Sequence, residues 1–320
     1  MNKAIGGYFG LELGKPTDSN PHISACAVNS GRNALYCILE TLKPTKLLVP
    51  RLFCDVILEP IRKLDIHFEF YSITESFQPK IDFLEKGTIL FYINYFGVCD
   101  SCVAKLVAKY PNQLIVDNSQ AFFSTPHQGI PTFYSARKFF GVPDGAYFYG
   151  VDYDLSQLPQ GTSWNRCSHL FKRIDISPEE GYQDFVQNEK YFSSLPYARI
   201  SKFTSLLFAT IDFTQVYKKR LANFNNLHKY LHSDNLFSRD FTCPISPISY
   251  PYQTDGAVDI RQYLIDNRVF VPVFWPESQE EQANDSNLNE FAHNILHLPI
   301  DQRYSGEDMS RIINLIRDVK

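Results

Sequence analysis

The 320-residue sequence has no long apolar run, whereas a membrane span needs about 18 consecutive apolar residues. Its first residues, 1–9, also lack the apolar core of roughly 7–15 residues that marks a secretory signal peptide. Charge of one sign is not concentrated anywhere, because 31 Lys and Arg stand against 35 Asp and Glu. A general surface for polyanions therefore has no support. These absences predict a cytoplasmic protein that binds neither membrane nor nucleic acid.

Cysteine is scarce and scattered: the seven residues are an odd number, which argues against a disulfide framework. One close pair, Cys99 and Cys102, has the C-x-x-C spacing of zinc sites and dithiols. No second ligand pair follows at zinc spacing, and Cys102 lies where a helix is expected to begin after Asp100. The sequence favours a helix start over metal or redox chemistry and predicts no metal site.

The composition, with 44% hydrophobic and 21% charged residues, is that of an ordinary globular protein. Between about residues 30 and 150, short apolar runs alternate with segments of helical period, which is typical of βα units. The clearest strands are expected at 46–50, 88–93 and 113–117. We therefore predict an α/β fold with a mostly parallel sheet.

The second half of the sequence has a different pattern. From 182 to 232 it has little Gly or Pro, and its apolar spacing predicts one long helix that begins near Arg199 and runs through Tyr217. A smaller α+β unit follows, so we expect a large domain at 1–235 and a small one at 236–320. The expected elements of the small domain are strands at 245–252 and 269–274 and helices at 258–265 and after Ser305.

Ligands of open α/β sheets bind at the carboxyl ends of the strands, so polar residues that follow the strands identify the candidate site. Ser30, Gly31 and Arg32 open a helix, where unpaired backbone amides and the helix dipole favour an anion such as phosphate. An ordinary helix cap is the alternative for this segment alone.

Asp117 ends the most apolar of the strands, where an ionised carboxylate is costly to bury unless it meets a cation. Gln120 lies three residues further on, and its amide can donate a hydrogen bond to a phenolate-like oxygen. A carboxylate that only caps the next turn remains the alternative for this pair.

Lys138 lies in an aromatic segment, 133–140, which is followed by a turn-rich Gly-Val-Pro-Asp-Gly stretch. Apolar surroundings and the adjacent Arg137 should lower the pKa of a lysine and favour the neutral amine that a Schiff base needs. A solvated surface lysine is the alternative for Lys138.

Together these segments resemble the type I pyridoxal-phosphate (PLP) aminotransferases, in particular the DegT/DnrJ/EryC1/StrS group of nucleotide-sugar aminotransferases. The family's S-G-T-x-A-L, H-x-[FY]-G and E-D-A-A-Q patterns have counterparts at 30–35, 94–97 and 116–120. Its lysine segment, R-[ML]-S helix opening and L-P-[LM] ending are similar to 138–146, 199–201 and 296–300.

The resemblance implies a role for each matching residue. Lys138 would hold PLP covalently, Asp117 would keep the pyridine nitrogen protonated, and Gln120 would bind the phenolic oxygen. The other implied cofactor contacts are Ser30, Gly31, Arg32 and Ser135 at the phosphate, Phe53 stacked on the ring, and Tyr197 near the phosphate of a neighbouring subunit.

The activity implied is transfer of an amino group from a glutamate-like amino acid to a keto-sugar nucleotide, by a homodimer with composite sites. Lys138 would move the proton in both half-reactions. Two departures stand out: Arg32 replaces the family's Thr, and Tyr197 stands where the family often has Asn. The alternatives are a different PLP reaction, such as that of a lyase or an amino-acid aminotransferase, or a non-catalytic partner role.

Overall fold

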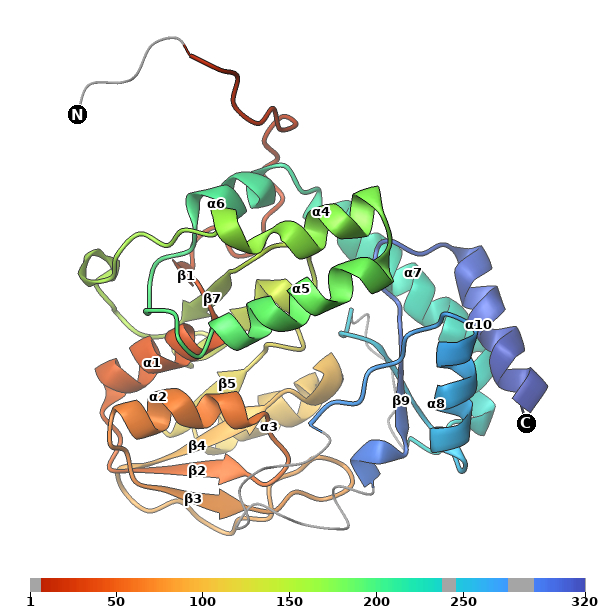
Figure 1. Ribbon diagram of the computed structural model, residues 1–320. Coiled ribbons are helices and arrows are strands. Elements are labelled where there is room, and N and C mark those ends of the chain that lie inside the picture. Colours follow the sequence, from red (N-terminus) through yellow and green to blue (C-terminus); the bar gives the residue numbers. More distant parts are fainter. Residues whose placement is uncertain (1–6, 238–245, 276–290, 320) are drawn as a thin grey trace.

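The sheet at the centre of the molecule is built from the expected apolar segments (Figure 1). We describe a computed structural model that places residues 7–237, 246–275 and 291–319. Seven strands form one sheet in the order β1-β7-β6-β5-β4-β2-β3. Neighbours from β3 to β6 pair in parallel, whereas β7 is antiparallel to both β6 and β1. The strands are β1 (Cys26–Val28), β2 (Lys46–Pro50), β3 (Phe68–Tyr71), β4 (Thr88–Ile93), β5 (Leu114–Asp117), β6 (Thr132–Ser135) and β7 (Ala146–Tyr149).

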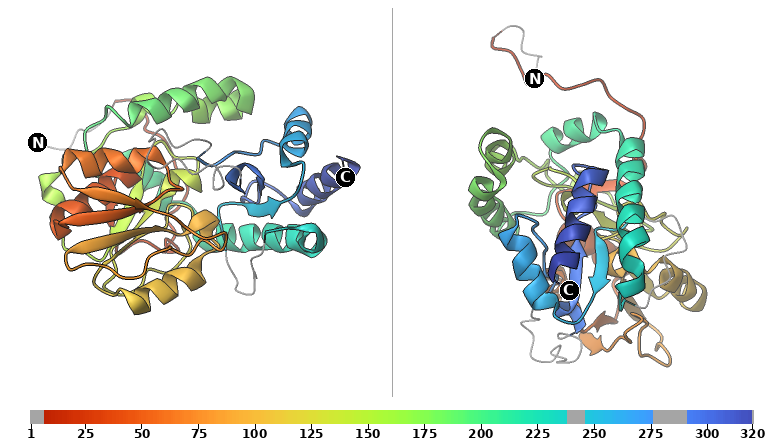
Figure 2. Two further views of the ribbon diagram at one scale, coloured as in Figure 1. Left: turned by 90° about the horizontal axis from the view of Figure 1, so that it is seen from below. Right: turned by 90° about the vertical axis from the view of Figure 1, so that its right-hand side faces the viewer.

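The central strands are buried throughout because helices cover both faces of the sheet. Every residue of β4 and β5 is buried, as expected for parallel strands that face a core on both sides. Figure 2 shows α3, in gold, on the opposite face from α1 and α2, in orange. The helices of this region are α1 (Gly31–Leu42), α2 (Leu58–Lys63), α3 (Asp100–Lys109), α4 (Ser168–Asp175), α5 (Pro178–Tyr191) and α6 (Lys202–Ala209). The α/β class and the mostly parallel sheet are confirmed.

The C-x-x-C segment is the start of a helix, as the sequence favours. Helix α3 begins at Asp100, so Cys102 lies in its first turn and Cys99 directly precedes it. Both cysteines are buried, and Cys102 Sγ lies 3.9 Å from the carbonyl oxygen of Phe77.

The single long helix expected from Arg199 is wrong. The structure has two helices, α6 and α7 (Phe213–Leu231), separated by residues 210–212. Asp212 begins α7 as its N-cap, because its side chain accepts a hydrogen bond from the amide of Gln215. The apolar spacing continues across this break, since Phe208 and Phe213 are both buried in the same core. None of the helices within the described ranges is long and apolar enough to cross a bilayer.

The C-terminal part is a second, smaller layer of helices on a two-stranded sheet. Strands β8 (Tyr250–Gln253) and β9 (Ile295–Leu298) pair antiparallel, with α8 (Ala257–Asp266) and α10 (Gly306–Val319) packed on them. The strand expected at 269–274 is wrong, because this segment pairs with no strand and only Val269 and Val271 are buried. Residue 245 of the other expected strand lies outside the described residues.

Helix α7 contributes to the C-terminal core. Its residues Phe224, Leu227 and Leu231 lie in the same apolar cluster as the residues of β8, β9, α8 and α10. This cluster therefore begins upstream of the expected boundary at 235. The division into domains 1–235 and 236–320 stays a prediction.

Candidate active site

Asp117 ends β5 in a buried turn at the carboxyl edge of the sheet. It is 6% exposed, and its Oδ1 accepts a hydrogen bond of 2.7 Å from the amide of Ser119. Burial raises the pKa of Asp117, while the charge of Lys138 and the hydrogen bonds from Ser119 act in the opposite direction. The ion pairs of the described residues do not include this carboxylate. A buried carboxylate with so few partners gains most from a bound cationic group.

Lys138 approaches the same turn from the next strand. It ends a short 3₁₀-helix, Ala136–Lys138, that follows β6, and its Nζ donates a hydrogen bond of 3.0 Å to Ser119 Oγ. The expected apolar surround is wrong, because Lys138 is exposed while Phe139 and Phe140 are buried in the core. Successive residues of a 3₁₀-helix point in directions about 120° apart, so neighbours in sequence do not enclose one another.

Gln120 supplies a hydrogen-bond donor that has no acceptor. It is fully buried, and its Oε1 accepts a hydrogen bond of 2.8 Å from the amide of Phe96. Phe96 has a left-handed backbone (φ 56°), which is uncommon for a bulky residue and which this hydrogen bond helps to hold. The other end of the amide, Gln120 Nε2, is buried with no partner among the described residues. Such a donor is costly unless a ligand atom accepts from it.

The N-terminus of α1 has the features of an anion site. Ser30 is the N-cap, and its Oγ accepts a hydrogen bond from the amide of Asn33, so the hydroxyl is used in capping. The amides of Gly31 and Arg32 lie in the first turn, where no carbonyl within the helix can accept from them. A Cβ added at Gly31 would meet only the ring of Phe133, at 3.6 Å, which is an ordinary contact. Packing within the chain therefore does not require Gly at position 31, whereas close approach of a ligand would.

Phe53 packs within the core. It is 1% exposed, and its ring centroid lies 5.5 Å from that of Phe70 on β3. The expectation that Phe53 stacks on a cofactor stays a prediction. Ser135, expected at the phosphate, is half-buried at the end of β6.

Tyr197 has partners within its own chain. Its hydroxyl donates a hydrogen bond of 3.4 Å to Glu59 Oε1, and Lys63 Nζ lies 4.0 Å from its ring centroid. Glu59 also accepts a hydrogen bond of 2.8 Å from Arg32. Glu59 therefore links Tyr197 to Arg32 at the anion site of the same chain. Its expected contact with a neighbouring subunit stays a prediction.

Arg137, the neighbour of Lys138, belongs to a cluster around Phe192. The guanidinium carbons of Arg137, Arg166 and Arg32 lie 4.0, 5.2 and 6.0 Å from this ring centroid. Arg137 forms an ion pair with Glu189, and burial together with the two other arginines lowers its pKa to about 9. Phe192 itself is 3% exposed, so the ring is buried.

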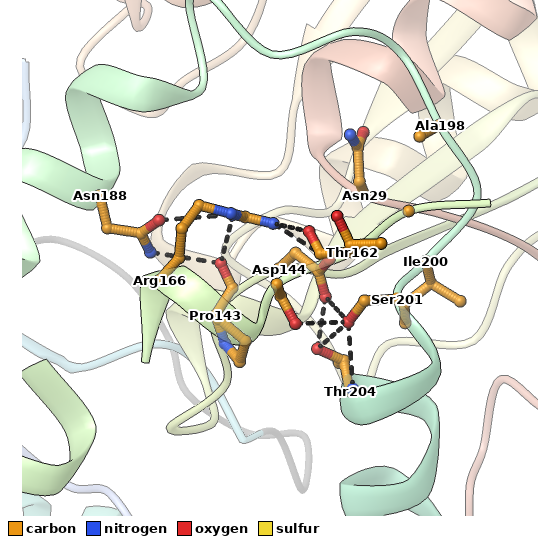
Figure 3. A network of polar contacts seen from close by, with 12 residues as sticks. Asn29, Pro143, Asp144, Thr162, Arg166, Asn188, Ala198, Ile200, Ser201 and Thr204 are labelled. Carbon is orange, nitrogen blue, oxygen red and sulfur yellow. Dashed lines mark hydrogen bonds and ion pairs between the residues drawn. The ribbon is translucent and has the colours of Figure 1, made fainter. Parts of the chain in front are cut away.

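A second buried carboxylate, Asp144, anchors the chain that follows Lys138 (Figure 3). It is fully buried, its Oδ1 accepts hydrogen bonds from Ser201 Oγ (2.9 Å) and from the Thr204 hydroxyl, and its Oδ2 pairs with Arg166 at 3.4 Å. Gly145 follows with φ 120°, and a Cβ there would lie 3.2 Å from Ile200. This network fixes the lysine segment against the start of α6.

Sequence reasoning missed two of these residues. The sequence does mark Ser119 as unusual, because this serine stands where the family pattern E-D-A-A-Q has its second alanine. Arg166 gave no such signal in the sequence, since it ends a short 3₁₀-helix, Trp164–Arg166, that no motif marks.

The comparisons with known proteins agree with this architecture. No protein-family model matches the sequence, and no curated protein is significantly similar to it. The fold is similar to the sugar aminotransferase CalS13 from Micromonospora echinospora, with 13% identity, 92% of this chain and 87% of that chain covered, and a TM-score of 0.62. It is also similar to a DegT DnrJ EryC1 StrS aminotransferase from Brucella abortus (13% identity, 92% and 85%, TM-score 0.61). A third similar structure is the PLP form of Spr1654 from Streptococcus pneumoniae (17% identity, 93% and 88%, TM-score 0.64). The chain therefore has the fold of the PLP-dependent aminotransferases.

Proposed function

We propose that this protein is a PLP-dependent aminotransferase that moves an amino group from a glutamate-like amino acid to a keto-sugar nucleotide. The observation that carries the proposal is the Lys138 amine, joined through Ser119 to the buried carboxylate of Asp117, which forms no ion pair among the described residues. Similar solved structures include PLP and pyridoxamine-phosphate (PMP) forms of Spr1654, and others are described as sugar aminotransferases.

The residues fit this cofactor on three independent grounds. Asp117 is a buried carboxylate with a raised pKa, which suits a protonated pyridine nitrogen. Gln120 Nε2 is a buried donor that finds no acceptor within the described part of the chain, which suits the phenolic oxygen. Gly31 leaves room at a helix N-terminus, which suits the phosphate, with the Arg32 amide in the same turn. Ser135 is expected to add a contact to the phosphate.

The protein's part in the reaction is to hold and to move protons. PLP supplies the electron sink that stabilises negative charge on the carbon of the amino acid. Asp117 keeps that sink effective because its charge favours the protonated pyridine nitrogen. Lys138 Nζ would hold the cofactor covalently and, when free, would carry a proton to and from the reacting carbon. Ser201 and Thr204 hold the lysine segment through Asp144.

Absorbance spectroscopy with product analysis tests this proposal. Protein incubated with PLP should acquire a visible band that glutamate removes, with one equivalent of 2-oxoglutarate released per site. A keto-sugar nucleotide should then restore the band and yield an amino sugar. A band that glutamate leaves unchanged would favour a different PLP reaction. No band at all, from correctly folded protein, would favour the non-catalytic role.

We also propose that the chain works as a homodimer. Leu206 on α6 and Tyr191 on α5 are 59% and 46% exposed, more than an apolar core position allows. An open cavity of about 420 Å³ beside Leu206, lined also by Arg199 and Lys202, gives a second copy a place to bind. Light scattering should then give twice the chain mass of 36.9 kDa. The mass of a single chain, with cofactor bound and activity intact, would contradict the dimer.

A further inference from the structure

Ser119 lies between the two charged groups of the site. Its amide donates to Asp117 Oδ1 at 2.7 Å, and its hydroxyl accepts from Lys138 Nζ at 3.0 Å. Ser119 is 7% exposed, so water competes poorly for its hydroxyl. We infer that Ser119 is a positioning residue that holds the Lys138 amine for attack on the aldehyde of PLP. The inference rests on the proposed function.

A hydroxyl suits this task better than a carboxylate does. The Lys138 amine must be neutral to attack an aldehyde and charged after it has taken up a proton. A serine hydroxyl accepts a hydrogen bond from the charged amine and donates one to the neutral amine, so it can hold Nζ in both states. A carboxylate only accepts and stabilises the charged state. The ion pairs of the described residues do not join Asp117 to Lys138, so the hydroxyl of Ser119, and not this carboxylate, contacts Nζ.

The exposure of Lys138 makes such a partner necessary. An exposed lysine has many rotamers, and only a small fraction of them bring Nζ to the carboxyl end of β5. Within the part of the chain that the structure describes, the hydroxyl of Ser119 is the hydrogen-bond partner that fixes Nζ. Fixing a nucleophile beside its target accelerates attack because the orientation is set before the reaction.

Alanine cannot do this, and alanine is what the family pattern E-D-A-A-Q has at this place. The hydroxyl is therefore a feature of this chain and not a requirement of the fold. In this chain the hydroxyl of Ser119 orients the exposed Lys138 side chain, a task that the expected apolar surroundings would otherwise perform.

The step affected is the covalent capture of PLP. In this step the neutral Lys138 amine forms a carbon–nitrogen bond with the aldehyde carbon. It gives up two hydrogens, which depart with the aldehyde oxygen as water. No oxidant or other reactant is needed.

Stopped-flow absorbance measures this step when cofactor-free protein is mixed with PLP. We expect Ser119→Ala and Ser119→Gly, which both remove the hydroxyl, to capture PLP about 10- to 100-fold more slowly than the wild type. Ser119→Thr keeps a hydroxyl and should recover most of the rate. Ser124→Ala is the matched control, because Ser124 Oγ donates to Asp100 at 3.2 Å and not to Lys138.

A second measurement separates positioning from a merely structural role. PMP has no aldehyde and makes no bond to Lys138, so its dissociation constant should be unchanged in Ser119→Ala. Weaker PMP binding in step with slower PLP capture would contradict the inference. Capture of PLP at the wild-type rate by either Ser119→Ala or Ser119→Gly would also contradict the inference, but it would leave the proposed function intact. Failure of the wild type to capture PLP would overturn both.

Discussion

Asp117 and Asp144 are both buried aspartates, one before and one after Lys138 in the sequence, and they differ in their partners. Asp144 is fully buried, paired with Arg166, and accepts from the hydroxyls of Ser201 and Thr204. Asp117 is almost as buried, yet it has the amide of Ser119 and no ion pair among the described side chains.

On the proposed function, this difference separates a carboxylate that stabilises the fold from one that binds a ligand. Removing a partner from a satisfied buried charge is strongly destabilising, so Asp144 contributes to stability. A buried carboxylate with a raised pKa and an amine nearby is typical of a site whose chemistry is completed by a bound group. The same residue type thus has two roles, decided by what surrounds it.

Asp117→Asn should have the largest effect on activity. We expect the amino-transfer half-reaction to slow by about 10³-fold, because an amide cannot keep the pyridine nitrogen protonated. Single-turnover kinetics with glutamate measure this. Near-normal turnover would mean that Asp117 only caps the turn after β5.

The same variant should not destabilise the cofactor-free fold. The raised pKa means that folded Asp117 holds its proton to higher pH than the unfolded chain does. Stability from this group is thus lost as pH rises from its unfolded pKa to its folded pKa. Asn carries no charge, so the Asp117→Asn variant should be at least as stable as the wild type at pH 7 in urea unfolding. A clear loss of stability would mean that Asp117, like Asp144, stabilises the fold.

Asp144→Ala should have the largest effect on stability. We expect a loss of about 3–5 kcal/mol, because Arg166 is left buried without its counter-ion. Urea unfolding of the cofactor-free protein measures it, with exposed Asp152→Ala as the control, for which a change within about 0.5 kcal/mol is expected. A small loss for Asp144→Ala would mean that the network of Figure 3 is not needed for folding.

His22 is a third buried polar residue, and its effect on stability should depend on pH. It is buried, its ring nitrogens lie 2.7 Å from Phe122 O and 3.0 Å from Tyr149 Oη, and burial lowers its pKa from 6.5 to about 4. Its contribution to stability is therefore present above pH 6.5 and lost as pH falls toward 4. The stability advantage of wild type over His22→Phe should shrink by about 2 kcal/mol between pH 7 and pH 5.

Gly31→Ala should have the smallest effect on the fold. The new methyl meets Phe133 at an ordinary distance, so we expect unchanged or slightly higher stability, by up to about 1 kcal/mol. Affinity for PMP should fall about 10-fold, since the methyl lies where the phosphate approaches the helix. Equal affinity in calorimetric titrations would argue against a phosphate at this helix.

The sequence predicts the parts of this fold that depend on local pattern. The buried runs of β4 and β5 and the start of α3 were predictable, because a strand covered on both faces is apolar throughout. The break between α6 and α7 was not, since the apolar spacing runs through it. The expected strand at 269–274 depended on a partner strand, which only tertiary structure supplies.

For the site, the sequence predicts which segments meet but not how single side chains point. Asp117 and Lys138 meet as expected, whereas Phe53 faces the core and Lys138 faces solvent. The link through Ser119 depends on a distance of 3.0 Å between residues 19 positions apart, which no periodicity encodes.

The most direct test of the central claim is to locate the cofactor's covalent bond. Protein loaded with PLP is reduced with borohydride, and the modified peptide is identified by mass spectrometry. Lys138→Arg, which keeps the positive charge, serves as the matched variant. The account predicts a stable adduct on Lys138 in the wild type and none at any position in the variant. An adduct on another lysine, or an equal yield in the variant, would contradict it.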